Sequence, residues 1–120
     1  MNTQNGKIVI SGQNLFQMDL VLLSLIPDLK LVNNDLKTIS SLFVLSNLKQ
    51  LEAENLDKVH GYQFPNLKKI ATKGEVVFAD FPSLKSIFDY QKNKWVSIDK
   101  KNYLGYKGGK LIGRKNHTNI

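Results

Sequence analysis

The stretch that decides the fold reads IPDLKLVNNDLKTI and covers residues 26–39. Its apolar residues follow the order L-x-x-L-x-L-x-x-N-x-L-x-x-I, with Ile26 in the first leucine position and Asn34 in the asparagine position. Residues 48–59, LKQLEAENLDKV, follow the same order, with Ala53 in the third apolar position and one residue fewer before the next leucine. Two such segments in succession predict a repeated structural unit.

A shorter frame, L-K-x-[L/I], extends the repetition along the chain, beginning at Leu48, Leu67 and Leu84. We mark the period by the residue of each expected strand that faces inward, and successive markers are 17 to 22 residues apart. The markers are Ile10, Leu31, Ala53, Thr72 and Asp89. About five repeats are expected, which exceeds the roughly three that stacked repeats need for stability.

This pattern resembles the leucine-rich repeat family, in the short and irregular form of bacterial and phage proteins. The resemblance implies an α/β solenoid of about five short coils, with a parallel β-sheet on its concave face and a mostly irregular convex side. A strand in such a coil points alternate residues inward. Asparagine readily bonds backbone groups in turns, so we expect Asn34 and Asn55 to be buried where the strands end.

The length predicts one domain covering residues 1–120. Within it we expect repeats over 7–90, a β-rich basic cap over 91–112 that closes the core, and a flexible tail over 113–120. The dense apolar segment 16–26 suits a short helix on the convex side.

Composition and motifs exclude several functional classes. The chain has no cysteine, which rules out disulfides and thiolate zinc sites. It shows no secretory signal and no apolar run of the roughly 20 residues that cross a bilayer, so a cytoplasmic protein without membrane association is expected. His60 and His117 are isolated and lack metal-ligand spacing, and no nucleophile or phosphate-binding motif occurs. We therefore expect no enzymatic activity, no metal and no cofactor.

The concave face is where the leucine-rich repeat family usually binds, and alternation along the strands predicts which residues face outward there. Exposed aromatic residues beside charged ones are typical of interface anchors. The predicted protein-binding residues are Lys30, Val32, Glu52, Glu54, Lys73, Phe88 and Tyr90. One alternative stays open, because a register slip of one residue in the fifth coil would move Phe88 and Tyr90 into the core.

The positive charge is concentrated near the C-terminus. Residues 1–90 hold nine lysines and nine carboxylates, whereas residues 91–120 hold eight cations and only Asp99 as an acid. The cations of this basic patch are Lys92, Lys94, Lys100, Lys101, Lys107, Lys110, Arg114 and Lys115. The patch is interpreted as a cap that contacts an acidic partner, as a solvated cap, or as a nucleic-acid surface in which interleaved rings stack on bases.

The resemblance and the absence of catalytic motifs together predict a non-enzymatic protein–protein recognition module. An inhibitor, adaptor or effector that binds a host or partner protein complex fits this description. The alternative is binding of RNA or a ribonucleoprotein through the C-terminal segment of lysines and aromatics. The chain is expected to be a monomer or a weak homodimer, since open sheet edges favour self-association.

Overall fold

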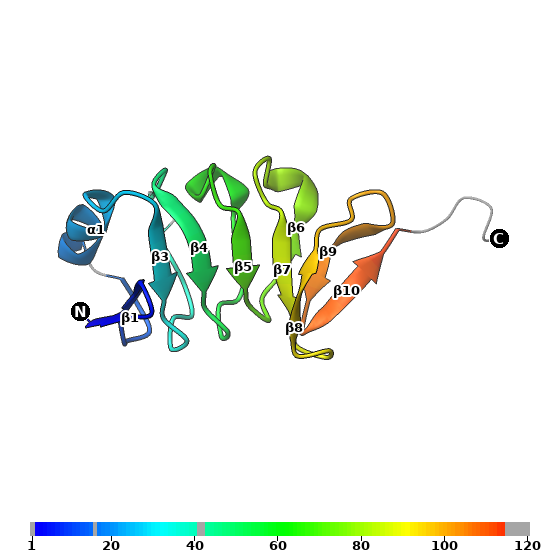
Figure 1. The fold of residues 1–120 in the computed structure, drawn as a ribbon, viewed down its shortest axis with the longest axis horizontal. Coiled ribbons are helices and arrows are strands. Elements are labelled where there is room, and N and C mark those ends of the chain that lie inside the picture. Colours follow the sequence, from blue (N-terminus) through cyan, green and yellow to red (C-terminus); the bar gives the residue numbers. More distant parts are fainter. Residues whose placement is uncertain (1, 16, 41–42, 115–120) are drawn as a thin grey trace.

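The computed structural model of the 120-residue chain describes residues 2–15, 17–40 and 43–114. Its described part is built mainly from short strands that follow one another along the long axis of the molecule (Figure 1). The strands are β1 (Asn2–Gln4), β2 (Lys7–Val9), β3 (Leu29–Val32), β4 (Leu48–Glu52), β5 (Lys69–Ala71), β6 (Val76–Val77), β7 (Ser86–Asp89), β8 (Lys94–Ser97), β9 (Tyr103–Lys107) and β10 (Lys110–Gly113). The helical segments are α1 (Gln17–Ser24) and two 3-10 turns, η1 (Gly61–Gln63) and η2 (Phe78–Asp80).

The strands form two sheets. The larger has seven strands in the order β1-β2-β3-β4-β5-β7-β8, and the smaller has three in the order β10-β9-β6. In the larger sheet β2, β3, β4, β5 and β7 run parallel, whereas β1 and β8 lie antiparallel at the two edges. The smaller sheet is antiparallel throughout and packs beyond β7.

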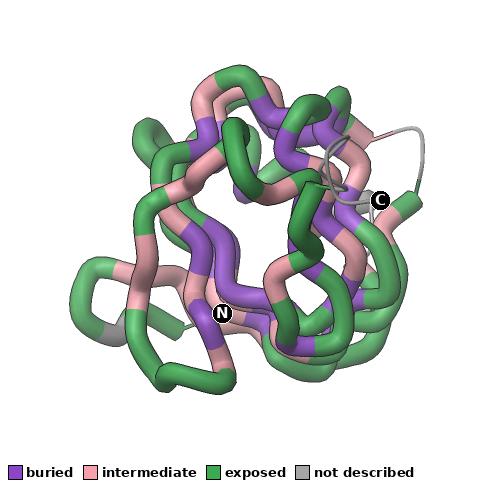
Figure 2. Tube along the Cα trace, turned by 90° about the vertical axis from the view of Figure 1, so that its right-hand side faces the viewer, coloured by how far each residue is buried: buried purple, intermediate pink, exposed green. Residues whose placement is uncertain are grey.

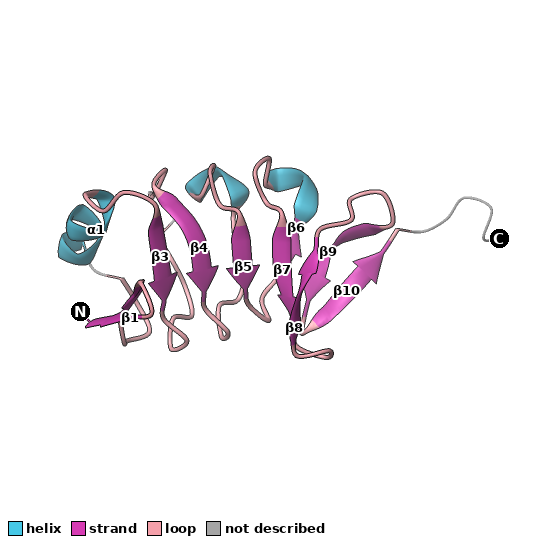
Figure 3. Cartoon of the chain, in the orientation of Figure 1, coloured by secondary structure: helices cyan, strands magenta, loops and turns pink. Residues whose placement is uncertain are grey.

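The expected α/β solenoid with a parallel sheet is wrong. The described chain is a small β-rich domain whose larger sheet is mixed, and its one α-helix has eight residues (Figure 3). Glycine, proline and β-branched residues between β4 and β7 disfavour helix, so those connections make only single 3-10 turns. After β7 a turn at residues 91–93 reverses the chain and adds the antiparallel strand β8.

Aligned aliphatic side chains form the core beneath the larger sheet. Leu31, Leu51, Ile70 and Ile87 lie opposite one another on β3, β4, β5 and β7, and none is more than 1% exposed. Buried residues line the inside of the wound chain and exposed residues its outside (Figure 2). Burial of each such side chain stabilises the fold by about 1.5–3 kcal/mol. The L-K-x-[L/I] frame therefore marks the buried positions of β4, β5 and β7.

The register of β3 differs from the expected one. Leu31 pairs with Leu51, whereas the sequence pattern had aligned it with Ala53. Asn33 is therefore the residue equivalent to Ala53, and the backbone N–H groups of both donate to the next strand. The sequence pattern equates Ile26 with Leu48 and Leu29 with Leu51, whereas Leu29 pairs with Leu48 and Leu31 with Leu51. The expected strand is therefore two residues out of register at Leu31.

Asn33, and not Asn34, is the buried asparagine of this turn. Its side chain is fully buried, and its Nδ2 donates to the carbonyl oxygen of Gly12 at 3.1 Å. Its Oδ1 accepts a hydrogen bond from the backbone N–H of Asp35 at 3.2 Å. Asn34 and Asn55, which we expected to be buried, are exposed. The inward position just after β3 belongs to Asn33, because side chains alternate along the strand.

The same turn chemistry recurs at the ends of β5 and β7. The buried Thr72 Oγ1 accepts a hydrogen bond from the N–H of Gly74 at 3.0 Å, and the buried Asp89 Oδ1 accepts one from Gln91 at 2.9 Å. In each case a side chain at the inward position bonds the backbone two residues on, which stabilises a tight turn.

The remaining expectations concern the chain ends and membranes. Residue 113 still belongs to β10, and residues 115–120 of the expected tail lie outside the described part of the chain. The described residues contain no helix of the length and apolar character that a membrane span requires.

Candidate functional site

The outward face of the larger sheet carries a hollow where β4, β5, β7 and β8 lie side by side. Glu52 pairs with Ala71, and Phe88 pairs with Trp95 across the antiparallel edge. The hollow has a volume of about 220 Å³. It is lined by Lys7, Asn34, Glu52, Glu54, Ala71, Phe88, Tyr90 and Trp95.

Three aromatic rings form one wall of this hollow. The ring centroids of Phe88 and Tyr90 are 4.9 Å apart and those of Phe88 and Trp95 are 5.5 Å apart. Both pairs meet edge to face, with interplanar angles of 74° and 78°. This geometry is favourable for aromatic pairs and holds the rings in place. All three are half-buried, so part of each ring remains accessible to a partner.

Two carboxylates form the facing wall, and each has a lysine beside it. Lys73 Nζ lies 3.0 Å from Glu54 Oε2 and 5.3 Å from the centroid of the Tyr90 ring. Lys7 forms an ion pair with Glu52. Lys73 thus occupies a position between a carboxylate and an aromatic face, where a cation is attracted by both.

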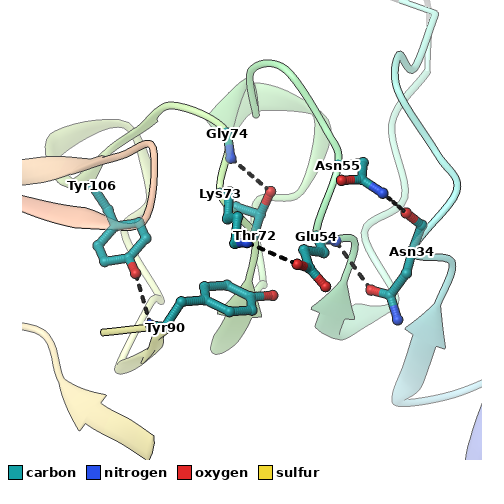
Figure 4. Close-up of polar contacts among 8 residues, drawn as sticks. All are labelled: Asn34, Glu54, Asn55, Thr72, Lys73, Gly74, Tyr90 and Tyr106. Atoms are coloured by element: carbon teal, nitrogen blue, oxygen red, sulfur yellow. Dashed lines mark hydrogen bonds and ion pairs between the residues drawn. The ribbon is translucent and has the colours of Figure 1, made fainter. Parts of the chain in front are cut away.

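Hydrogen bonds to neighbouring turns fix the walls of the hollow (Figure 4). The N–H of Glu54 donates to Asn34 Oδ1 at 3.1 Å, and Asn55 Nδ2 donates to the carbonyl oxygen of Asn34 at 2.7 Å. The N–H of Tyr90 donates to the hydroxyl oxygen of Tyr106 at 2.9 Å. The exposed asparagines therefore position Glu54, whereas a residue of the smaller sheet positions Tyr90.

The surroundings of Tyr90 and Tyr106 favour neutral phenols. Burial raises the pKa of Tyr90 well above its ordinary value, and the negative charge of Glu54 raises it further. Burial also raises the pKa of Tyr106, against a smaller opposite effect of its hydrogen bond with Tyr90. The aromatic wall is uncharged at neutral pH, and its charged neighbours are the carboxylates of Glu52 and Glu54 and the ammonium groups of Lys69 and Lys73.

Most of the predicted protein-binding residues meet in this hollow. Glu52, Glu54, Phe88 and Tyr90 line it, and Lys73 contacts two of them. Asp89 lies inward and is 4% exposed, which puts Phe88 and Tyr90 on the outward face.

Lys30 and Val32 lie elsewhere on the same face. Lys30 pairs with Gln50 in the middle of β4, and Val32 pairs with Glu52. Because Leu31 pairs with Leu51 and not with Ala53, the neighbour of Glu52 on β3 is Val32 and not Lys30.

The sequence pattern did not predict that Trp95 is part of the hollow. Its place follows from the β7–β8 hairpin, which sets Trp95 directly opposite Phe88. The asparagine at position 93 is the sequence signal for this turn. Its φ is 54°, a conformation that asparagine tolerates better than most residues. A hairpin centred on residues 91–93 would have predicted the pair.

The predicted basic patch is divided between the two ends of the sheet. Lys107 lies at the carboxyl ends of the parallel strands, with its Nζ 4.0 Å from Glu75, and the next residue donates to the carbonyl oxygen of Lys73. Lys100 lies at the opposite end, where its Nζ donates to the carbonyl oxygen of Phe81 at 3.2 Å. The first group contains Lys92, Lys94, Lys107 and Lys110. The second contains Lys100, Lys101 and Arg114, and Lys115 lies outside the described residues.

Asp99 shapes the turn that carries the second group. The side-chain amide of Asn102 donates to Asp99 Oδ2 at 2.8 Å, and the backbone N–H groups of Lys101 and Asn102 donate to Oδ1. These bonds lower the pKa of Asp99, and the bond from the Asn102 side chain has the largest effect. The only acid of the C-terminal segment therefore serves to close a turn.

Comparison with protein-family models, curated proteins and solved structures finds no match for this chain. The resemblance to the leucine-rich repeat family rests on the residue pattern alone and stays a prediction.

Proposed function

We propose that this chain is a non-enzymatic recognition module that binds a protein through the hollow between Glu52, Glu54 and the aromatic wall. The observation that carries the proposal is the cluster of Phe88, Tyr90 and Trp95 beside two carboxylates. Aromatic side chains in a hollow surrounded by polar groups are the usual anchors of protein interfaces.

The charges of the hollow define the partner side chain that it suits best. Lys73 shows the arrangement within the molecule, with its ammonium between Glu54 and the ring of Tyr90. An arginine of a partner would satisfy the same two groups and could stack its planar guanidinium on the aromatic wall. The proposed partner therefore presents an exposed arginine or lysine next to an apolar residue.

The cellular role that we propose is that of a small inhibitor, adaptor or effector acting on a protein complex in a bacterial or phage-infected cytoplasm. Among the described residues, no three histidine or acidic side chains gather as metal ligands. We propose that binding itself is the output of the module.

Nucleic-acid binding through the whole C-terminal segment is less well supported. That function needs the lysines on one surface, and the described ones lie at two ends of the sheet. The cations nearest the carboxyl ends also lie beside Glu75, which reduces the local positive potential.

Affinity capture from lysate of the source cell tests the proposed function. The tagged chain is compared with a Phe88→Ala, Tyr90→Ala double variant, with nuclease present throughout. A matched control truncates two exposed apolar residues far from the hollow in the sequence, Val21→Ala in α1 and Leu25→Ala directly after it. We expect a discrete protein with the wild type and the control and its loss with the double variant. Equal capture by all three proteins would exclude the hollow.

A further inference from the structure

A row of lysines crosses the larger sheet at the start of its strands. Lys49, Lys68 and Lys85 occupy the second position of the three L-K-x-[L/I] frames. The backbone N–H of Lys68 donates to the carbonyl oxygen of Lys49, and that of Lys85 to the carbonyl oxygen of Lys68, both at 2.8 Å. Lys49 lies in β4, and Lys68 and Lys85 directly precede β5 and β7, so the three backbones follow one another at the roughly 4.8 Å spacing of adjacent strands.

The row borders a groove that contains no acid. Two further lysines complete its walls, and its volume is about 310 Å³. The groove is lined by Lys30, Lys49, Gln50, Lys68, Lys69, Lys85 and Ser86. The salt bridges of the described residues involve Lys7, Lys58, Lys73 and Lys107, so none of the five groove lysines has a carboxylate partner there.

The charges of the first 90 residues sum to zero along the chain but are separated in space. The groove gathers lysines and no acid at the amino ends of the strands. A separate depression at the carboxyl ends combines three acids with two lysines and is lined by Glu54, Asp57, Glu75, Lys73 and Lys107. Like charges on neighbouring strands repel one another and weaken a sheet. A ligand that carries a row of negative charges would relieve this repulsion.

Two neighbouring features extend the groove. The N–H of Ile98 donates to the carbonyl oxygen of Lys85, which continues the row onto β8 and the turn that carries Lys100 and Lys101. On the other side, Lys69 Nζ lies 5.1 Å from the centroid of the Trp95 ring. A chain of anions in the groove would thus pass beside an accessible aromatic ring.

We propose that this groove, called here the lysine groove, binds the phosphates of a single-stranded nucleic acid, with an unpaired base on Trp95. Phosphate binding needs regularly spaced cations, and sequence-tolerant single-strand binding combines them with a stacking ring. An acidic protein is a poorer fit, because the lysine groove has no apolar or aromatic residue at its centre to anchor an interface. The lysine groove and the hollow have separate charged residues and share only Trp95.

The test uses the full chain and a fluorescein-labelled oligo(dT) of about 16 nucleotides, within the usual range of single-strand sites. Fluorescence anisotropy gives Kd at several salt concentrations for the wild type and for the triple variant Lys49→Gln, Lys68→Gln, Lys85→Gln. The matched control, Lys92→Gln, Lys94→Gln, Lys110→Gln, removes the same charge from the other end of the sheet. Thermal unfolding of both variants verifies that they are folded.

We expect the groove variant to bind at least tenfold more weakly and the control to stay within about threefold of the wild type. Because each phosphate contact on a single strand contributes about −0.7 to the slope of log K against log salt, the groove variant should lose about 2 from that slope. Equal weakening of the two variants would overturn the proposal, since it would indicate attraction by net charge alone. Absence of measurable wild-type binding at low salt would overturn it as well.

Trp95 is the only tryptophan of the chain, so its emission reports on base stacking. We expect oligo(dT) to quench this emission, whereas heparin, a polyanion without bases, should bind without comparable quenching. Polyglutamate serves as the probe for an acidic protein. If polyglutamate or duplex DNA binds as tightly as oligo(dT), or if oligo(dT) leaves the emission unchanged, the assignment to single-stranded nucleic acid is wrong.

Discussion

The hydroxyl oxygen of Tyr106 accepts a hydrogen bond from the backbone N–H of Tyr90 at 2.9 Å. Tyr106 belongs to β9 of the smaller sheet and is fully buried, whereas Tyr90 directly follows β7 of the larger sheet. The bond therefore joins the two sheets and holds the residue that forms the aromatic wall of the hollow. Stability of the fold and shape of the candidate site depend on the same contact.

Replacing Tyr106 with phenylalanine should destabilise the protein by about 1–3 kcal/mol, because the N–H of Tyr90 loses its acceptor in a partly buried place. Urea unfolding measures this change. Tyr103→Phe is the control, because the Tyr103 hydroxyl makes no hydrogen bond within the described residues and its ring is also partly buried. Equal unfolding free energies for the two variants would mean that the contact contributes nothing.

Stability should fall at alkaline pH. Burial and the charge of Glu54 raise the pKa of Tyr90 above its ordinary value of 10.0, so the folded state holds that proton more tightly than the unfolded state. This contribution is complete below the unfolded pKa of about 10 and is lost as pH rises toward the folded value. Urea unfolding at several pH values should show a smaller alkaline loss for Tyr90→Phe than for the wild type. An identical loss in both would contradict this origin.

Gly74 lies where two adjacent connections touch. A Cβ atom there would be 1.9 Å from the carbonyl oxygen of Leu56, a backbone atom that cannot move aside locally. Gly74→Ala should cost about 3 kcal/mol or more. Gly108→Ala is the comparison, since its Cβ would meet nothing within 4 Å and only its φ of +61° carries a penalty, about 1–2 kcal/mol. Thermal unfolding should rank Gly74→Ala clearly lower, and the reverse order would contradict the close packing.

The two neighbouring asparagines offer a test of the register. Asn33→Ala removes a buried amide that donates to Gly12 and accepts from Asp35, and should cost about 2 kcal/mol. Asn34→Ala removes exposed contacts and should cost less than about 1 kcal/mol. Urea unfolding of both variants decides between the registers. A larger loss of unfolding free energy for Asn34→Ala than for Asn33→Ala would support the register that the sequence pattern predicted.

The sequence predicted which positions are buried better than it predicted the architecture of the fold. Leu51, Ile70 and Ile87 could be placed inside because the L-K-x-[L/I] frame repeats and buried strand positions demand aliphatic residues. The predicted α/β fold class was wrong. Strand direction after β7 depends on the turn at residues 91–93, and an apolar repeat does not encode whether the next strand is parallel or antiparallel.

The candidate site was predicted only in part, because the pairing across the turn at residues 91–93 was not predicted. Alternation along β7 placed Phe88 and Tyr90 on one face, but Trp95 reaches them only through pairing across the hairpin. A sum of charges along the chain does not reveal the lysine groove, because it carries no information on where the charges lie in space. Lys49, Lys68 and Lys85 are cancelled by acids in that sum, although in the fold these lysines lie together in a groove whose lining contains no acid.

Protein binding in the hollow is tested most directly by titrating the captured partner into the purified chain and measuring Kd by calorimetry. The wild type, the Phe88→Ala, Tyr90→Ala variant and the Lys49→Gln, Lys68→Gln, Lys85→Gln variant are compared under one buffer condition. We predict a loss of at least 2 kcal/mol, about thirtyfold in Kd, for the aromatic variant and almost none for the lysine variant. Unchanged affinity of a folded aromatic variant would contradict the account, because the partner would then bind elsewhere on the molecule.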